Sequence, residues 1–272
     1  MRILVYVDPS SRGEWAIAPA VDLARGLCRT ITLLTTEENL KQDPTLLERA
    51  AKPFQEIENV EVETRSRPGP ARQAILTESS DSVPTITVFP PAGRWTLSRM
   101  LRGSRVKTVV HNSPSTVMVA RRPVSDHIRR ILVTVSGGPM SETTLASAQE
   151  IAHAVGAEWN VLHVSSTVAI PFGEVKTEAP PAHEPVKKML AKLAGEGDPV
   201  RVLVRNGMVV HEILQECHDG GYDLLILGQH LADRETGGPL SENIAEILAV
   251  ECPIPVLIVR PTRWAANTAS GA

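Results

Sequence analysis

Short, almost continuously apolar runs alternate along this chain with segments in which apolar residues recur at helical spacing. The first run, residues 2–8, lacks an alternation of polar and apolar positions, which is typical of a strand covered on both faces. After it, apolar residues recur as on one side of a helix: Ala16, Ala20, Leu23, Ala24 and Leu27. Further strands are expected at residues 30–35, 60–64, 85–89 and 116–120. This alternation predicts a parallel α/β layer of five strands.

The same pattern restarts at residue 130. Residues 130–136 repeat residues 2–8 almost position for position. Later strands are expected at residues 159–164, 200–204, 223–228 and 255–260. A repeat of this length indicates duplication of a whole domain, because each copy has enough strands to bury a sheet of its own.

The repeat divides the chain into two predicted domains. The first covers residues 1–124 and the second covers residues 125–272, with a short polar link at residues 121–127. Residues 167–185 are rich in Pro and Gly and are expected to form a long excursion over the second domain. The tail from residue 262 onwards has small and polar residues and is expected to be frayed.

Size, charge and cysteine content narrow the class of protein. A chain of 272 residues fits two domains of the usual size, and 42% of its residues are apolar, enough for packed cores. Its 28 basic and 31 acidic residues nearly balance and only 3% are aromatic, which argues against a nucleic-acid binder. No apolar run approaches the roughly 20 residues that span a bilayer, and the amino terminus lacks the pattern of a secretory signal. Three cysteines without paired spacing indicate reduced thiols, so a cytoplasmic location is expected.

The segment from Phe89 to Val106 carries the clearest candidate chemistry. It joins the carboxyl end of an expected strand to the first turn of an expected helix, and it contains two glycines, two serines and four arginines. Free backbone N–H groups and the helix dipole suit an anion such as phosphate at this place, where open parallel sheets usually bind ligands. The alternative is an exposed basic loop in which Gly103 and Ser104 only begin a helix. This segment alone favours neither interpretation.

The repeat and its closing strands resemble the universal stress protein family in its tandem two-domain form. Each copy ends in a proline-flanked strand, at residues 112–119 and at residues 252–259. The nucleotide-binding branch of that family carries a loop written G-x2-G-x9-G-[ST] after the fourth strand. The first copy has Pro90-x2-Gly93-x9-Gly103-Ser104, so the spacing and three of four positions match. Proline in place of the first glycine lacks an N–H and fixes φ, which puts the approach of a ribose and phosphate in question.

For the first copy the resemblance implies a site for ATP or another adenine nucleotide, and whether Mg²⁺ accompanies the nucleotide stays open. Asp8 matches the family's acidic residue after the first strand and would lie near the adenine or ribose. Val7 would pack beside it. Gly93 would let the backbone approach the ribose and phosphates closely.

The resemblance places the phosphates at the start of the helix that follows. Gly103 and the N–H groups of Ser104, Arg105 and Val106 would hold phosphate oxygens, and the Ser104 hydroxyl would add a contact. On physical grounds rather than from the family, four arginines are expected to neutralise charge there: Arg94, Arg99, Arg102 and Arg105. The alternative for any single one of them is a solvated polar face.

The second copy departs further from the family loop. Ser136 replaces the acidic residue, Gly228 is kept, and Leu231 stands where the family has its second glycine. Leu240-Ser241 or Glu242-Asn243 stands in place of Gly-Ser, depending on the position of a gap. We therefore expect no family-type ATP site in this copy, which would be a structural partner that has lost its ligand.

Other motifs add little catalytic chemistry. Residues 136–141 are similar to the S-G-G-x-D-[ST] loop of PP-loop ATP pyrophosphatases, but Met140 replaces its aspartate, which leaves Gly137-Gly138 as a candidate anion-binding turn. His163 ends a buried strand and is expected to belong to the core. The histidines form no compact metal motif, and no G-x-S-x-G elbow or P-loop is present. These observations argue against a dedicated hydrolase or transferase.

The expected architecture is two open, Rossmann-like, five-stranded parallel sheets with helices on both faces. Each sheet would have strand order 3-2-1-4-5 with right-handed crossovers. The copies are expected to associate through their last strands, near residues 117–120 and 256–259, because those apolar edges would otherwise be exposed. The chain would thereby imitate a dimer, and pairing of two chains into a homodimer stays open.

Three functional hypotheses follow. The first is a stress-response module whose first copy binds ATP and whose occupancy changes a surface for an unknown protein partner, with no membrane or nucleic acid involved. The second is an interaction protein in which both nucleotide sites have degenerated. The third is a slow ATPase, ranked last because no base or metal cluster is identifiable.

Overall fold

The computed structural model describes residues 1–81, 86–91, 105–122, 125, 127–138, 140–165, 186–189, 191, 200–229 and 244–260. In the first half, strands alternate with helices as the sequence predicts. The strands are β1 (Arg2–Tyr6), β2 (Thr30–Thr36), β3 (Glu61–Arg67), β4 (Ile86–Phe89) and β5 (Thr116–Val119). The helices are η1 (Gly13–Ala16), α1 (Ile17–Leu27), α2 (Glu37–Gln42), α3 (Leu46–Gln55), α4 (Ala71–Asp81) and α6 (Arg105–Asn112).

The second half repeats this order. Its strands are β6 (Arg130–Thr134), β7 (Glu158–Ser165), β8 (Arg201–Asn206), β9 (Leu224–Gly228) and β10 (Val256–Val259). Its helices include α7 (Met140–Val155), α9 (Val209–Asp219) and α10 (Ile244–Glu251). The excursion expected at residues 167–185 and the tail after residue 262 lie outside the described residues.

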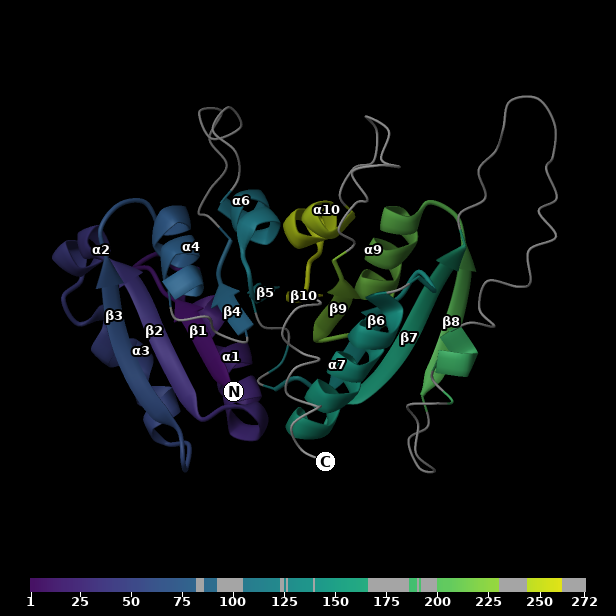
Figure 1. Ribbon diagram of the computed structural model, residues 1–272, viewed down its shortest axis with the longest axis horizontal. Helices are drawn as coiled ribbons and strands as arrows, with labels where there is room; N and C mark the ends of the chain where they lie inside the picture. Colours follow the sequence, from purple (N-terminus) through teal and green to yellow (C-terminus); the bar gives the residue numbers. More distant parts are fainter. Residues whose placement is uncertain are drawn as a thin grey trace, which may run out of the picture.

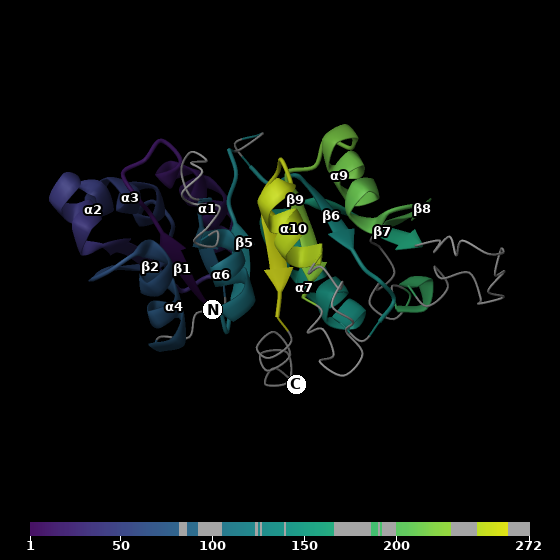
Figure 2. The same ribbon diagram turned by 90° about the horizontal axis from the view of Figure 1, so that it is seen from above.

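The described strands form one ten-stranded sheet in the order β3-β2-β1-β4-β5-β10-β9-β6-β7-β8. Within each half all strand pairs are parallel, which confirms the predicted order 3-2-1-4-5. The halves meet where β5 pairs antiparallel with β10, with Val119 opposite Val256 (Figures 1 and 2). The predicted association through the last strands is confirmed. It makes one continuous sheet out of the two expected sheets, because each half covers the apolar edge of the other.

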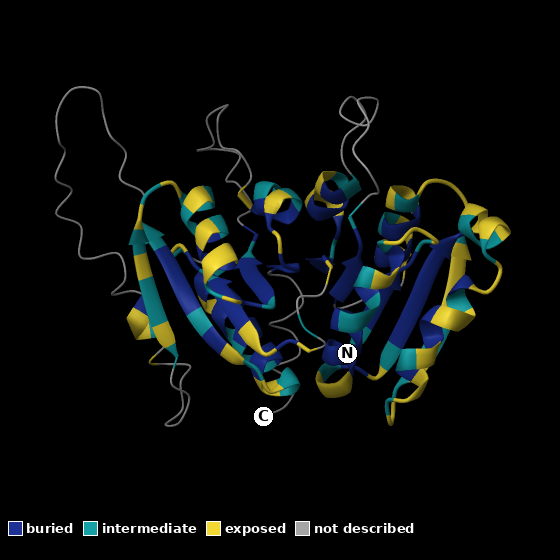
Figure 3. Cartoon of the chain, turned by 180° about the vertical axis from the view of Figure 1, so that it is seen from behind, coloured by how far each residue is buried: buried dark blue, intermediate teal, exposed yellow. Residues whose placement is uncertain are grey.

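Helices cover both faces of this sheet (Figure 1). One apolar core lies between the sheet and α1, α3 and α7, and a second lies between the sheet and α4, α6, α9 and α10. Alternate residues of β1 enter the two cores, Ile3 and Val5 the first and Leu4 and Tyr6 the second. Residues of the inner strands are buried, whereas the edge strands β3 and β8 carry many exposed polar positions (Figure 3). The outer edges therefore discourage further strand pairing.

The two halves also meet through equivalent helices. Helix α1 packs against α7, and a Cβ atom added at Gly26 would lie 2.2 Å from the carbonyl oxygen of Ala154. Because β1–β2 and β6–β7 have the same register, Gly26 and Ala154 occupy equivalent positions on their helices. Glycine at residue 26 is therefore needed for the close approach of the two helix backbones.

Two arginines cross the β5–β10 junction, and each forms hydrogen bonds with a helix of the other half. Arg121 follows β5 and donates to the carbonyl oxygens of Ala249, Val250 and Cys252 at the end of α10, at 2.5, 3.0 and 3.0 Å. Arg260 follows β10 and donates to the carbonyl oxygens of Val110 and His111 at the end of α6. Both arginines are buried, and burial lowers the pKa of each guanidinium. Each half thus satisfies the last carbonyl groups of a helix in the other half.

Helix α2 was not predicted from the sequence. Thr36 ends β2 and caps this helix, since its hydroxyl accepts a hydrogen bond from the Asn39 N–H at 3.3 Å. Glu37 and Glu38 occupy the first turn, where acidic residues favour the helix dipole. Among the described residues, no helix is long and apolar enough to cross a membrane.

Candidate functional site

The candidate site lies at the carboxyl end of β1, the strand at which the chain order of the first half reverses. β1 pairs with β2 on one side and with β4 on the other. Val7 and Asp8 directly follow β1, Pro90 directly follows β4, and Arg105 is the first residue of α6. In an open α/β sheet, a crevice between such strands is the usual place for a ligand.

Arg105 and Asp8 are joined directly at this edge of the sheet, where the crevice is expected. The Arg105 Nη1 atom donates to Asp8 Oδ2 at 3.3 Å, and Arg105 Nη2 donates to the Pro90 carbonyl oxygen at 2.8 Å. The guanidinium carbon lies 5.3 Å from the centre of the Tyr6 ring, in a cation–π contact. The side chains of Arg105 and Asp8 are only 11% and 14% exposed, so water screens this ion pair less than one on the open surface.

Asp8 is also held by its own loop. Its Oδ1 atom accepts hydrogen bonds from the Ser10 backbone N–H, at 3.1 Å, and from the Ser10 hydroxyl. A Cβ atom added at Gly13 would lie 1.8 Å from the Asp8 carbonyl oxygen, so only glycine allows η1 to lie this close to the loop. Both carboxylate oxygens of Asp8 therefore have partners within the protein.

Tyr6, whose ring contacts the Arg105 guanidinium, is held in place by its surroundings. Tyr6 is buried, burial raises the pKa of its hydroxyl, and that hydroxyl accepts a hydrogen bond from Asn39 Nδ2 at 3.1 Å. The Val7 N–H donates to the Leu34 carbonyl oxygen, at 2.9 Å, and the Val7 carbonyl accepts from Thr35 Oγ1 at 2.8 Å. Val7 is thus fixed to β2 by both its N–H and its carbonyl group, immediately before Asp8 leaves the strand.

The structure brings together part of the predicted site. Asp8 and Arg105 meet at the ends of β1 and β4, and Asp8 directly follows Val7, whose own side chain is buried in the first core. The predicted role of Val106 rests on its N–H, and its side chain is buried in the second core. The remaining predicted residues lie outside the described residues: Gly93, Gly103, Ser104, Arg94, Arg99 and Arg102. The Pro90 carbonyl accepts a hydrogen bond from Arg105, a contribution for which its missing N–H is irrelevant.

Sequence reasoning did not identify Tyr6 and Asn39 as part of this crevice. Tyr6 could have been found, because it immediately precedes Val7 on the first strand and is one of only two tyrosines in the chain. Asn39 could not, because it belongs to the unpredicted helix α2. The direct bond between Asp8 and Arg105 also went unpredicted, since each residue was expected to face a ligand.

The equivalent crevice in the second half is built from different residues. Ser136 stands in the place of Asp8, and the pairing of β9 and β10 aligns Ile244, at the start of α10, with Arg105. In the Gly137-Gly138 turn, the Gly137 N–H donates to Ser141 Oγ at 3.0 Å and the Gly138 N–H donates to Ser136 Oγ at 3.3 Å. The two amides expected to face an anion are therefore engaged within the turn.

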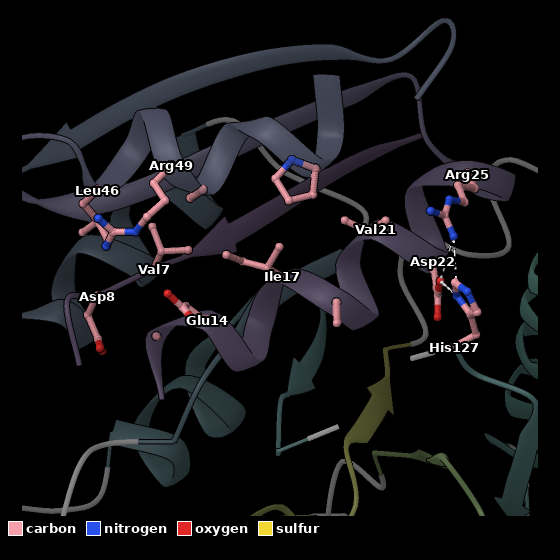
Figure 4. Close-up of a pocket in the computed structure, with 14 residues that line it drawn as sticks. Val7, Asp8, Glu14, Ile17, Val21, Asp22, Arg25, Leu46, Arg49 and His127 are labelled. Atoms are coloured by element: carbon pink, nitrogen blue, oxygen red, sulfur yellow. Dashed lines mark hydrogen bonds and ion pairs between the residues drawn. The ribbon is translucent and has the colours of Figure 1, made fainter. Parts of the chain in front are cut away.

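A separate groove of about 410 Å³ runs between α1 and α3 on the opposite face of the sheet (Figure 4). Its walls are mainly apolar, with Ile17 and Val21 on α1 and Leu46 on α3. Asp8 and Val7 line one end, so the groove begins beside the candidate site. Its volume lies in the range of pockets that bind small molecules.

Several charged groups that line this groove have partners within the protein. Arg49 donates to Asp43 Oδ2 at 2.7 Å, and the pKa of the Asp43 carboxyl is lowered by that bond. At the far end, Asp22 accepts the Ile128 N–H at 2.8 Å and lies 3.0 Å from His127 Nδ1, which fastens the interdomain link to α1. Within the described ranges, no group of His, Cys, Asp and Glu side chains is arranged to hold a metal ion.

Comparison with protein-family models gives one match, to the model described as universal stress protein family. It matches twice, over residues 1–121 and over residues 127–260. The comparison with curated proteins gave no match.

Comparison with solved structures gives full-length matches. A universal stress protein from Archaeoglobus fulgidus has 17% identity and a TM-score of 0.71, with 95% of this chain and 96% of that chain covered. One from Pseudomonas aeruginosa has 17% identity and a TM-score of 0.72, with 98% and 95% covered. A shorter one from Arabidopsis thaliana, solved with AMP bound, has 18% identity and a TM-score of 0.35, with 46% of this chain and 93% of that chain covered. At 17% identity, the likeness to the two full-length structures shows a shared fold.

Proposed function

The chain belongs to the universal stress protein family in its tandem form, and on that premise we propose that its first half binds an adenine nucleotide as a regulatory module. The nucleotide, ATP or a related one, would lie at the carboxyl ends of β1 and β4. Asp8 would accept hydrogen bonds from its ribose or base, and the start of α6 would face its phosphates. Members of this family have been solved with cAMP and with AMP.

The observation that carries this proposal is the convergence of Asp8 and Arg105 in one crevice. It supplies an acceptor for hydroxyl or amine groups and a cation for phosphate within a single site. The second half offers Ser136 and Ile244 at the equivalent positions, which supply neither charge. The proposed stoichiometry is therefore one nucleotide for each chain.

The regulatory part of the proposal is supported by the position of α6. This helix begins at Arg105 beside the crevice and ends at the carbonyl groups that Arg260 of the second half holds. On its side it packs against α10, where His111 Nδ1 lies 3.1 Å from Glu246 Oε1. A shift of α6 on nucleotide binding would therefore change its contacts with Arg260 and α10 at the junction between the halves.

One observation favours the second hypothesis, an interaction protein without nucleotide. Arg105 already spans the crevice between Asp8 and the Pro90 carbonyl, which is what a closed, degenerate site would show. A slow ATPase is favoured by no observation at the described residues. Hydrolysis would need a general base or a metal site in addition to the binding groups.

Titration calorimetry with ATP separates these functions. The wild-type protein is expected to bind, and Gly103→Glu is expected to lose binding because a carboxylate would occupy the proposed phosphate position. Ser136→Glu places the same charge at the equivalent crevice of the second half and is the matched control, expected to bind as wild type does. Absence of binding in all three proteins would overturn the proposal and support the interaction protein.

A further inference from the structure

We propose that Arg105 and Asp8 form a lock on this site that only a phosphate-bearing ligand opens. The inference rests on the proposed function, and it names the ligand class and the control of the same site. It concerns the discrimination between a nucleotide and the corresponding nucleoside, which share every group except phosphate.

The lock consists of three contacts made by one guanidinium. Arg105 reaches Asp8 Oδ2 at 3.3 Å, the Pro90 carbonyl at 2.8 Å and the face of Tyr6 at 5.3 Å. Asp8 Oδ1 is meanwhile held by Ser10. A ligand that is to hydrogen-bond the Asp8 carboxylate must therefore compete with Arg105, Ser10 or both.

A neutral ligand cannot replace the ion pair that Arg105 would lose on release of Asp8. If adenosine formed hydrogen bonds with the Asp8 carboxylate in place of Arg105, the largely buried guanidinium would lose its anionic partner. Leaving a buried charge unpaired makes the free energy of binding less favourable. A phosphate group changes this balance, because it offers Arg105 a bidentate anion in exchange for Asp8. The freed carboxylate can then accept hydrogen bonds from the ribose or base. Phosphate binding and release of Asp8 are thus one coupled exchange.

Arg105 also carries an N–H group that could bind a phosphate. A guanidinium carries five N–H groups, and Arg105 Nε is buried with no hydrogen-bond partner among the described residues. Arg105 opens α6, a helix of eight residues, so a phosphate it binds would also lie near the amide groups of the first turn. The arginine is therefore placed to turn from Asp8 towards a phosphate without leaving the crevice.

The second half lacks this lock. Ile244 and Ser136 stand in the places of Arg105 and Asp8, and Thr134 stands in the place of Tyr6. None of these side chains can form the ion pair or the ring contact. The lock therefore belongs to the half that is proposed to bind the nucleotide.

The test measures the affinities of adenosine and AMP for the wild-type protein and for Arg105→Gln. Glutamine keeps a polar side chain but cannot pair with Asp8 as a cation. The substitution is expected to weaken AMP binding by about tenfold or more and to strengthen adenosine binding by about tenfold, because the lock is gone while Asp8 remains. The two ligands thus change in opposite directions.

Two further variants separate the lock from simple loss of charge. Arg49→Gln removes one positive charge near Asp8, from an arginine bound to Asp43, and is expected to leave adenosine affinity unchanged. Arg105→Lys keeps the charge without the planar fork and is expected to fall between wild type and Arg105→Gln for both ligands. Thermal unfolding of each variant checks that it is folded.

Each outcome decides between the claims. If Arg105→Gln weakens AMP and leaves adenosine unchanged, Arg105 is an ordinary phosphate ligand and the lock is overturned while the proposed function stands. If AMP affinity is unchanged as well, Arg105 has no part in binding. If no protein binds either ligand, or ATP, the proposed function and the lock fail together.

Discussion

The two halves of the molecule share one fold and differ where their strands end. β1–β2 and β6–β7 have the same register, and the strand order is the same in both halves. At the crevice, however, Asp8 and Arg105 of the first half correspond to Ser136 and Ile244 of the second. Duplication has preserved the buried apolar pattern that specifies the sheet, whereas residues at the carboxyl ends of the first and fourth strands differ between the halves.

The halves also share a partly buried ion pair between the third strand and the following helix. Arg67 on β3 pairs with Glu78 on α4 at 2.7 Å, and Arg205 on β8 pairs with Glu216 on α9. The Glu78 side chain is fully buried. Retention of the pair in both halves indicates that it serves the fold and not a ligand.

A buried polar network distinguishes the halves. In the first half, Thr87 Oγ1 lies 3.2 Å from Ser79 Oγ and 2.7 Å from Ser115 Oγ. The equivalent positions in the second half hold Leu225, Cys217 and Ile254. Two chemically different cores thus support the same backbone, so the network is one solution to packing among several.

The largest effect is expected where the two halves touch most closely. Gly26→Ala would place a Cβ atom 2.2 Å from the Ala154 carbonyl oxygen, and we expect the free energy of unfolding to fall by about 3 kcal/mol. Helix propensity alone would change it by about 1 kcal/mol in the opposite direction, so the sign of the change is diagnostic. Urea unfolding measures it, and a stabilised variant would show that α1 and α7 are not packed this closely.

The shared ion pair is expected to matter more in the first half than in the second. Arg67→Met removes the guanidinium that lies 2.7 Å from the fully buried Glu78 carboxylate, and it should cost about 2 kcal/mol even though Arg65 stays at 3.3 Å. Arg205→Met should cost less, about 1 kcal/mol, because Glu216 keeps a hydrogen bond from the Tyr222 hydroxyl at 3.2 Å. Chemical denaturation of both variants provides the comparison, and equal losses would contradict it.

The exchanged arginines offer a matched pair across the junction. Arg121→Met removes bonds to three carbonyl groups at the end of α10, and we expect a loss of about 1.5 kcal/mol. Arg260→Met removes bonds to two carbonyl groups at the end of α6, and a smaller loss of about 1 kcal/mol is expected. Arg122→Met, at an exposed neighbouring position, is the control and should be neutral. A larger loss for Arg260 than for Arg121 would reverse the ranking.

The smallest effect is expected in the polar network. Thr87→Val leaves the Ser79 and Ser115 hydroxyls without their shared partner and should cost about 1 kcal/mol. Thr32→Val is the matched control, because the buried Thr32 hydroxyl has no hydrogen-bond partner among the described residues. We expect the control to be neutral or stabilising in thermal unfolding. Equal effects of the two substitutions would show that the network contributes nothing.

Much of the fold could be predicted because its signal is local. Apolar runs such as residues 2–8 and their repeat at residues 130–136 specify the strands, and their number and order follow from general rules of α/β sheets. The apolar last strands even predicted how the halves meet. Helix α2 was missed because it is short and has no buried residue, so no hydrophobic periodicity marks it.

Contacts between distant residues could not be predicted in the same way. Cys217 and Cys252 have no paired spacing in the sequence, yet their thiols share a hydrogen bond in the second core, which raises the pKa of Cys217 and lowers that of Cys252. Arg121 bonds to α10 across more than a domain of sequence. Such partners depend on the tertiary fold, which no local pattern contains.

The candidate site could be predicted in part. The family resemblance identified Asp8, and physical reasoning about charge identified the Arg105 side chain, each in relation to a ligand. The bond between them depends on how closely α6 approaches the end of β1, and this is set by packing of Val109 and Val110 in the second core. For that reason the ion pair became visible only in the structure.

The inequality of the halves is tested most directly by the number of nucleotides that one chain binds. Native mass spectrometry of the chain with ATP should show one bound nucleotide in wild type and in Ser136→Ala, and none in Asp8→Ala. Two nucleotides on the wild-type chain, or one that survives Asp8→Ala and disappears in Ser136→Ala, would contradict the assignment of the site to the first half.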